Sequence, residues 1–339
     1  MFTLSAPSSS VRPASVHQAA TRDIDEQAAL LTGWNQSYAQ LSAGAFEGRI
    51  AEAWLDGVHL FVEGTSRRLH QHGALPGDRL ALGLPLAPVV GPAVLCGASD
   101  WAGDAHTGRF CTFSGAQGFE FFTPEGLQMA GMEIDRDELM RLATPDEQAL
   151  IARVGSTAAL HRASHDRVNG LRDFMRGAFE MLAREPGLLD NPAVRSQLRH
   201  AAQSNALEML VSAAHADEEA PVAPQRHWAL VQQARAQVSQ DPETPVTVAA
   251  LCAGLRVSRR TLQAAFQDVL GMAPAAYLRA ERLAGARRAL REAPTVTEAA
   301  AQWGFWHFGH FAQDYRRLFG ELPSQTWRRL RGGSDTTAH

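Results

Sequence analysis

The chain has 339 residues, 45 % of them hydrophobic, and a net charge of −4 at pH 7. This length excludes a single small module, and this composition excludes an intrinsically disordered chain. All basic residues are arginines: residues 1–225 hold 17 arginines and 27 acidic residues, whereas residues 226–332 hold 15 arginines and 8 acidic residues. An acidic front joined to a basic C-terminal third predicts that the C-terminal third contacts nucleic acid.

The first half of the chain is expected to be a flexible arm followed by a β-rich domain. Residues 1–20 lack the basic and apolar regions of a signal peptide and are interpreted as the arm. Residues 21–143 begin with a short helical segment, and Asp56-Gly57 then separates two strand-like runs, which predicts a tight hairpin. Further short apolar runs at 80–86, 89–95, 109–113 and 118–122 predict a small barrel or sandwich, which we interpret as a cupin-like sensor domain.

The candidate ligand-binding residues of this domain are aromatic. Trp54, Phe61 and Trp101 could line a small-molecule pocket, although core packing is the default role of such side chains. His70 and His72 would share one face of a strand and could bind a metal, but no glutamate follows at a suitable spacing. We therefore favour a surface or turn role for this pair and predict no metal site. No GxSxG-type nucleophile motif occurs, so we expect no catalytic residue.

The compartment follows from the cysteines and from the absence of a membrane segment. Cys96, Cys111 and Cys252 are odd in number and form no CxxC pair, which is typical of a protein of the reducing cytoplasm. Residues 81–98 carry no charge, but prolines and glycines interrupt them repeatedly. Because such residues break a helix, short strands with turns fit this stretch better than a membrane span. We predict a cytoplasmic protein without a membrane partner.

The middle of the chain is expected to be a helical dimerisation segment, residues 144–214. Residues 160–183 and 192–213 have the spacing of two long amphipathic helices, which would form an antiparallel hairpin. Their apolar stripe would remain for a second subunit, so we predict a homodimer. The acidic, proline-containing residues 215–225 are interpreted as a linker to the C-terminal domain.

Residues 226–332 contain an internal repeat, and residues 333–339 form a tail. The run from Leu270 to Pro274 recurs as Phe319 to Pro323, and a helix with matched apolar positions precedes each copy. Shorter helices lie further upstream and end near Gly254 and Gly304, which are expected to allow a tight turn. This order, taken twice, predicts two helix-turn-helix units joined by a linking helix at about 275–292.

The second helix of each unit presents polar side chains that suit DNA. Arginine can bind guanine with two hydrogen bonds, and glutamine can pair with adenine. The alternative is an ordinary solvated face, but the duplicated scaffold favours DNA contact. The predicted DNA-binding residues are Ser258, Arg259, Arg260, Gln263 and Gln267 in the first unit and His307, Gly309, His310, Gln313, Arg316 and Arg317 in the second.

The C-terminal region resembles the AraC/XylS family of transcription regulators. The resemblance rests on PxxYLxxxRLxxAxxxL at 274–290 and on VTEAAxxWGFxxxxHFxxxYRRLFGxxPSxT at 296–326. VSRRTLQ at 257–263 and YAQLSAGAFEG at 38–48 are most similar to the subgroup that activates ethanolamine operons. The resemblance implies an activator whose N-terminal domain senses ethanolamine and adenosylcobalamin.

The sequence therefore predicts a ligand-controlled transcription regulator of α+β class. Its partners would be double-stranded DNA, RNA polymerase, a small-molecule effector and a second copy of itself, with adenosylcobalamin as a possible effector and no certain cofactor. Two alternatives remain open. One is a barrel-fold, metal-dependent enzyme with a regulatory DNA-binding tail, and the other is a DNA-bending structural protein that responds to no small molecule.

Overall fold

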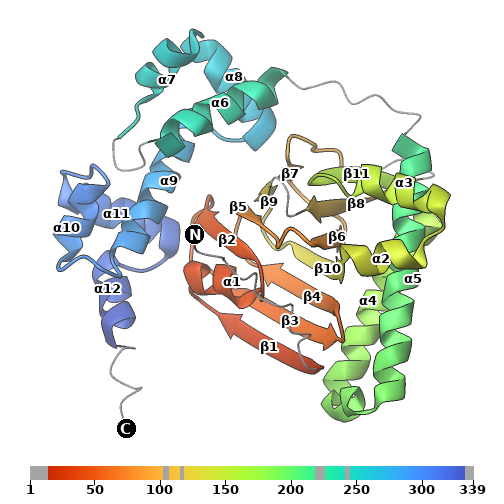
Figure 1. Ribbon diagram of the computed structural model, residues 1–339. Coiled ribbons are helices and arrows are strands. Elements are labelled where there is room, and N and C mark those ends of the chain that lie inside the picture. The colour runs from red at the N-terminus through yellow and green to blue at the C-terminus, as the bar shows by residue number, and fades with distance from the viewer. Residues whose placement is uncertain (1–13, 102–106, 115–117, 218–225, 241–244, 333–339) are drawn as a thin grey trace, which may run out of the picture.

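The chain folds into a β-rich N-terminal part and a helical C-terminal part (Figure 1). The structure is a computed structural model, and it describes residues 14–101, 107–114, 118–217, 226–240 and 245–332. We call residues 14–217 the N-terminal part and residues 226–332 the C-terminal part. The mixed architecture confirms the predicted β-rich front and helical end of the chain.

Two antiparallel sheets form the framework of the N-terminal part. The large sheet has the strand order β1-β3-β4-β10-β6-β8-β11, and the small sheet has the order β2-β5-β9-β7. The strands are β1 Ser15–Thr21, β2 Asn35–Gln40, β3 Gly48–Leu55, β4 Val58–Thr65, β5 Leu69–Ala74, β6 Arg79–Pro85, β7 Val94–Leu95, β8 Thr107–Ser114, β9 Phe119–Thr123, β10 Gln128–Asp135 and β11 Ala159–Ser164.

Backbone geometry explains why one strand prediction is confirmed and another is wrong. The hairpin at Asp56-Gly57 is confirmed: both residues have positive φ, 46° and 103°, as a tight turn between twisted strands requires. The expected strand at 89–95 is wrong except for Val94–Leu95. Pro88 and Pro92 lack the N–H group that a sheet needs, so most of this run is irregular.

The predicted arm is wrong over part of its length. Ser15–Thr21 form β1, which pairs with β3 along its whole length, from Ser15 opposite Trp54 to Thr21 opposite Gly48. Pairing supplies the backbone hydrogen bonds that hold this otherwise polar segment in place, a contribution that side-chain composition does not reveal. The rest of the predicted arm, residues 1–13, lies outside the described residues.

The space between the two sheets is filled by aromatic side chains. The ring of Trp34 lies 5.2–5.5 Å from the rings of Phe61, Phe113 and Phe119, and all three contacts are edge to face. Trp101 stacks on Phe121 of the small sheet at 5.3 Å. Phe61 and Trp101 are 6 % and 8 % exposed, so core packing describes both residues in this structure.

Helices cover the outer face of the large sheet. Figure 1 shows α4 and α5 side by side along it. Val168, Leu171, Met175 and Leu182 of α4 are buried in the same core as Leu60 and Leu82 of the sheet. The helices of the N-terminal part are α1 Ile24–Leu30, α2 Arg136–Leu142, α3 Pro145–Val154, α4 His165–Arg184, the 3₁₀ helix η1 Pro186–Asp190 and α5 Pro192–Asp217.

This packing corrects the interpretation of residues 144–214 as a dimerisation hairpin with an unused apolar stripe. The stripe is covered by the chain's own sheet, and Leu210 is fully buried in that core. The segment is also not wholly helical, because residues 159–164 form β11 at the edge of the large sheet and α4 begins only at His165. A helical apolar pattern shows that a face is buried but does not show which partner buries it.

The C-terminal part is built entirely of helices among its described residues. They pack around two apolar clusters, one at Phe266 and Tyr277, which residues of the N-terminal part such as Phe122 also join, and one at Phe311 and Tyr315. The predicted linker at 215–225 overlaps the end of α5, and its residues 218–225 lie outside the described residues, as does the predicted tail. The helices are α6 Arg226–Gln240, α7 Val248–Leu255, α8 Arg259–Leu270, α9 Pro274–Ala289, α10 Val296–Gln302, α11 Phe308–Phe319 and α12 Pro323–Gly332. None of the described helices has the length and apolar composition of a membrane span.

Candidate nucleic-acid interface

The first helix-turn-helix unit consists of α7 and α8. Ser258 caps α8, since its hydroxyl accepts a hydrogen bond from the N–H of Thr261 at 3.0 Å. Leu262, Ala265 and Phe266 are buried against the rest of the unit. The outward face predicted from the sequence is confirmed: Arg259, Arg260, Gln263 and Gln267 are all exposed.

The turn of this unit does not depend on Gly254, contrary to the prediction. Gly254 lies inside α7, and the residue with left-handed backbone is Arg256, at φ 54°. A Cβ atom at Gly254 would lie 2.7 Å from the side chain of Gln237 in α6. This contact is with the movable end of a flexible side chain, so the structure shows no strict need for glycine at 254.

The second unit consists of α10 and α11, and here the predicted glycine turn is confirmed. Thr295 caps α10 by accepting a hydrogen bond from the N–H of Glu298 at 3.1 Å, and Gly304 takes φ 71° after the helix. The outward residues His307, Gly309, His310, Gln313, Arg316 and Arg317 are exposed. Trp306 and Phe308, which stand beside them, are also exposed, at 72 % and 42 %.

The linking helix α9 holds the two units together. Its first half belongs to the apolar cluster of the first unit, through Tyr277 and Leu278, and its second half to that of the second unit, through Leu283 and Ala286. Arg282 donates to the carbonyl oxygens of Trp303 and Gly304, at 3.0 and 2.6 Å. The turn of the second unit is therefore tied directly to the linking helix.

The N-terminal part caps the ends of both exposed helices. Arg68 donates to the carbonyl oxygen of Leu270, the last residue of α8. Gln40 and the N–H of Gly44 donate to the carbonyl oxygen of Leu318 near the end of α11, at 2.6 and 3.0 Å. The last carbonyls of a helix have no partner within it, so these donors stabilise both helix ends. The two glycine turns of the sequence repeat thus lie against the N-terminal part.

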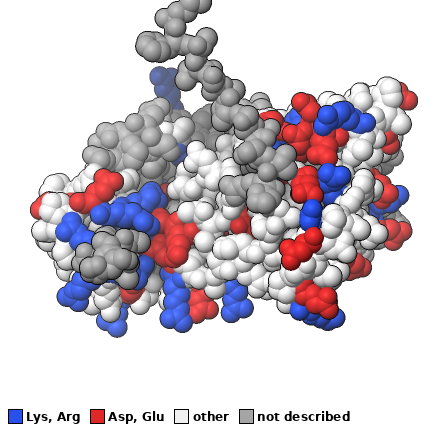
Figure 2. All heavy atoms as spheres, turned by 60° about the horizontal axis from the view of Figure 1, so that its bottom comes forward, with Lys and Arg blue, Asp and Glu red and all other residues white. Residues whose placement is uncertain are grey.

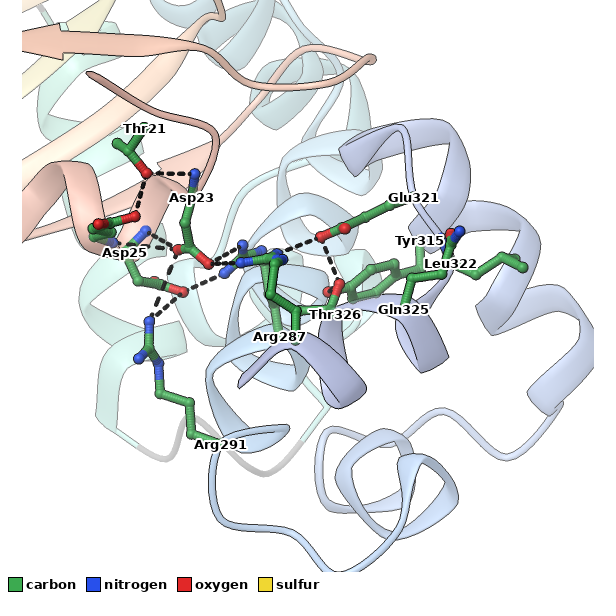
Figure 3. A network of polar contacts seen from close by, with 12 residues as sticks. Thr21, Asp23, Asp25, Arg287, Arg291, Tyr315, Glu321, Leu322, Gln325 and Thr326 are labelled. Carbon is green, nitrogen blue, oxygen red and sulfur yellow. Dashed lines mark hydrogen bonds and ion pairs between the residues drawn. The ribbon is translucent and has the colours of Figure 1, made fainter. Parts of the chain in front are cut away.

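A buried charge network joins α1 to the C-terminal part (Figure 3). Asp23 accepts from Arg287 of α9 at 2.9 Å and from Arg329 of α12 at 2.6 Å. Arg287 is 3 % exposed and also pairs with Asp25. Burial raises the pKa of Asp23, but the charges and hydrogen bonds of Arg287 and Arg329 outweigh it and hold the pKa well below its ordinary value. The carboxylate is therefore charged at neutral pH.

A second polar contact lies on the small sheet. His70 Nδ1 lies 2.8 Å from Glu281 of α9, and its Nε2 lies 2.9 Å from Arg235 of α6. Arg235 also pairs with Glu120 of β9. Burial and the nearby arginines lower the pKa of His70, so the neutral ring donates to Glu281 and accepts from Arg235.

This position corrects the surface or turn role favoured for His70, whereas His72 is exposed on β5, as a surface role requires. His70 is 2 % exposed and lies within β5, where both of its ring nitrogens face residues of the C-terminal part. Among the described residues, no group of three or more histidine, cysteine, aspartate or glutamate side chains is arranged to hold a metal ion. The spacing of the two histidines along the chain carries no information about the helices that pack on them.

A buried histidine that the sequence did not single out lies between two carboxylates in the N-terminal part. His59 is fully buried, with Nε2 3.0 Å from Glu52 and Nδ1 3.6 Å from Glu133. Trp54, one of the candidate ligand residues, stacks on this ring at 3.9 Å. Burial lowers the pKa of His59, but the two carboxylates outweigh it, so the pKa lies above its ordinary value.

The face of the molecule drawn in Figure 2 shows acidic groups beside a group of arginines towards the C-terminal helices. The pairs of Asp23 and Asp25 with Arg287, Arg291 and Arg329 join acidic residues of the N-terminal part to arginines of the C-terminal part. The charge asymmetry of the sequence therefore has two roles. Part of the basic excess pairs with the acidic N-terminal part, and the arginines of α8 and α11 remain exposed.

Comparisons with known proteins agree with this geometry. Residues 251–329 match the family described as "Helix-turn-helix domain". The chain is 41 % identical over 90 residues to the probable thc operon regulatory protein of Rhodococcus erythropolis, covering 25 % of this chain and 27 % of that protein. It is 42 % identical over 77 residues to the XylDLEGF operon transcriptional activator 1 of Pseudomonas putida, covering 22 % and 23 %.

One solved structure is also similar to part of this chain. It is a probable AraC family transcriptional regulator from Rhodopseudomonas palustris, 38 % identical, covering 30 % of this chain and 97 % of that chain, with a TM-score of 0.29. The chain spans about a quarter of the length of the curated relatives. Fold and site define a double helix-turn-helix domain. The C-terminal region of this chain is an AraC/XylS-family helix-turn-helix domain, and both curated relatives are named as operon regulators.

Proposed function

We propose that the whole chain is a sequence-specific transcription regulator, acting as an activator on double-stranded DNA and RNA polymerase. The observation that carries this proposal is the exposure of two matched polar helices, α8 and α11, which one linking helix holds in a fixed relation. The names of the relatives support it, since two of them regulate operons. The N-terminal part would be a cupin-like sensor, and the active form would be a homodimer.

The exposed residues fall into two proposed roles. Gln263 lies one turn into α8, and His310 lies in the first turn of α11, where side chains of a recognition helix reach base edges. Ser258, Arg259, Arg260 and Gln267 would contact bases or phosphates of the same half-site. His307, Gly309 and Gln313 would do so in the second half-site, and Arg316 and Arg317 would bind phosphates there.

The test is selection of binding sequences by the full chain from random duplexes, followed by footprinting. We expect two short protected patches about 34 Å apart, one helical turn, because the 16-residue α9 spans about 24 Å between the units. Arg260→Ala should weaken binding, whereas Arg328→Ala, which removes an exposed arginine of α12 outside the predicted set, should not. Binding without sequence preference would instead support a DNA-bending protein.

The effector is proposed from the sequence resemblance alone. Ethanolamine with adenosylcobalamin is the first pair to test, because residues 38–48 resemble the subgroup that senses them. That segment contains Gln40 and Gly44, which donate hydrogen bonds to the end of α11. An effector that moves this segment would therefore act directly on the second helix-turn-helix unit. Trp34, Phe61, Phe113 and Phe119 fill the space between the sheets. A corrin ring does not fit there, so a cobalamin would have to bind at another surface of the chain.

A thermal-shift screen of amino alcohols, each with and without cobalamins, tests the effector directly. An effector that binds the folded state raises the melting temperature in proportion to its saturation. Ethanolamine should stabilise the full chain more than propylamine of similar size, which lacks the hydroxyl group. Equal shifts for both amines, or none with any cobalamin, would reject this effector while leaving the DNA-binding function untouched.

A further inference from the structure

A groove runs beside α4, where this helix lies over the large sheet. One hollow, of about 650 Å³, lies between the second half of α4 and strands β1, β3 and β4. The other, of about 560 Å³, lies between the first half of α4, the start of β8 and the segment that follows β6. Leu86 and Arg176 line both hollows, so the two adjoin each other.

The first hollow is mostly apolar. Ala19, Ala51 and Val62 of the sheet form its floor, and Met175 and Phe179 of α4 form its wall. The two small alanines leave room that larger side chains would fill. Arg49, Arg176 and Glu180 are the charged residues of its lining. This end of the groove suits an apolar body of a ligand.

The second hollow is lined by three arginines. The side chain of Arg109 is 5 % exposed and pairs with Asp100. Arg172 donates to the carbonyl oxygen of Pro85 at 3.1 Å and to the side-chain oxygen of Asn169, and Arg176 donates to the carbonyl oxygen of Leu86.

The two arginines of α4 differ in their partners. A carbonyl and an amide oxygen orient Arg172 without cancelling its charge, whereas Arg176 also forms an exposed ion pair with Asp173 at 3.9 Å. Burial and the charge of Arg176 lower the pKa of Arg172. A bound anion would stabilise the charged form of Arg172 and offset this effect. His165 is the other titratable residue in the lining.

A buried donor lines the same hollow. Trp101 is 8 % exposed, and its Nε1 atom is buried without a hydrogen-bond partner among the described residues. Buried N–H groups are nearly always paired, because an unpaired one costs free energy. An oxygen atom of a ligand in this hollow is an acceptor of the required kind.

We propose that this groove binds a small amphipathic organic anion, with its acidic group at Arg172 and Arg176 and its apolar body against Ala51, Val62 and Phe179. Ethanolamine is a cation without an apolar body, so this would be a second ligand. The effector role of this anion rests on the proposed regulatory function. The binding of the anion does not depend on that function. Trp101, a candidate ligand residue from the sequence, lies at the arginine-lined end of the groove.

Calorimetric titration of the full chain with three ligands of equal chain length tests the proposal. Decanoate should bind at least about tenfold more tightly than decanol, because only decanoate makes charge-assisted hydrogen bonds. Decyltrimethylammonium should bind more weakly than decanol. All titrations are made below the micelle concentration. Equal binding of decanoate and decyltrimethylammonium would overturn the proposal, since it would show apolar adsorption without charge selection.

Variants locate the site. Arg172→Gln and Arg176→Gln should each weaken decanoate binding about tenfold and leave decanol binding unchanged. Arg184→Gln, on the same helix but outside the groove, is the matched control and should bind like the native protein. Ala51→Phe should fill the apolar end and weaken both ligands. An Arg184→Gln effect equal to that of Arg176→Gln would place the ligand elsewhere.

A separate measurement addresses the effector role. The affinity of the full chain for its selected DNA is measured with and without decanoate, in the native protein and in Arg176→Gln. A change of affinity in the native protein alone supports an effector site. Loss of DNA binding under all conditions would reject the proposed function but not the anion site, because calorimetry reports the site by itself.

Discussion

The side chains that face outward from α8 and α11 are of two chemical kinds, and substitution should separate them. Gln263→Ala should cost roughly 1 to 3 kcal/mol on the preferred DNA and relax base preference in one protected patch only. His310→Ala should do the same in the other patch, with a smaller effect because histidine reads bases less often. Selected-sequence profiles and footprints check both. If either variant blurs both patches, the assignment of the two helices is wrong.

Arg316 and Arg317 should bind phosphate rather than bases, because they lie in the last turn of α11. Replacing both by alanine should weaken binding to all sequences and lower the slope of log K against log salt by about two units at most. Asp314 lies 3.8 Å from Arg317. Arg316→Ala alone should therefore account for more of the change than Arg317→Ala. An unchanged salt slope in the double variant would show that neither arginine faces DNA.

His59 should make the stability of the N-terminal part depend on pH. Its pKa in the folded state lies above 6.5, so its stabilising ion pairs with Glu52 and Glu133 are fully present below pH 6.5 and are lost as the pH rises through the folded pKa. Urea unfolding followed from pH 6 to 9 should show this loss. His59→Gln should remove it, whereas His200→Gln, at an exposed position of α5 away from Glu52 and Glu133, should retain it. A pH profile that is the same in His59→Gln and in the native protein would contradict the prediction.

At the scale of elements, the packing of α4 and α5 on the large sheet changes what a charge in their stripe should do. Leu210→Glu places a carboxylate in the core of one chain and should destabilise the fold by at least about 3 kcal/mol, instead of producing a folded monomer. Chemical unfolding monitored by circular dichroism measures this. Glu208→Gln, at an exposed position of α5, is the control. A folded, monomeric Leu210→Glu variant would restore the dimerisation hairpin.

The oligomeric state itself remains a separate prediction. Sedimentation of the native chain at micromolar concentration should give a dimer if the regulator acts as a pair. The covered faces of α4 and α5 cannot supply that interface, so any dimer must use other surfaces.

At the scale of the whole molecule, the Asp23 network should hold the C-terminal part against the N-terminal part. Asp23→Asn leaves the buried Arg287 with Asp25 as its remaining acidic partner. It should therefore increase hydrogen exchange in α9 and α12 and separate the thermal unfolding of the two parts. Asp146→Asn, in the first turn of α3, should leave both measurements unchanged. Native-like exchange in Asp23→Asn would show that the other contacts suffice.

Chain composition and local pattern determined most of the C-terminal part. The apolar spacing of α8 and α11 and their exposed polar faces follow from helical periodicity, and the internal repeat by itself indicates two units. The turn at Gly304 and the cap at Thr295 are equally local features. The hairpin at Asp56-Gly57 was predictable for the same reason, since a turn depends on the backbone preferences of adjacent residues.

Contacts between distant segments were decided only by the tertiary structure. The sequence of α4 shows an apolar stripe, but only the sheet beside it identifies the partner. Ser15–Thr21 become a strand because β3 offers hydrogen bonds, and His70 becomes part of the domain contact because α6 and α9 pack on β5. The periodicity of apolar residues shows which face of a helix or strand is buried. It carries no information about which remote element buries it, and that information decides how the N-terminal part holds the two DNA-binding units.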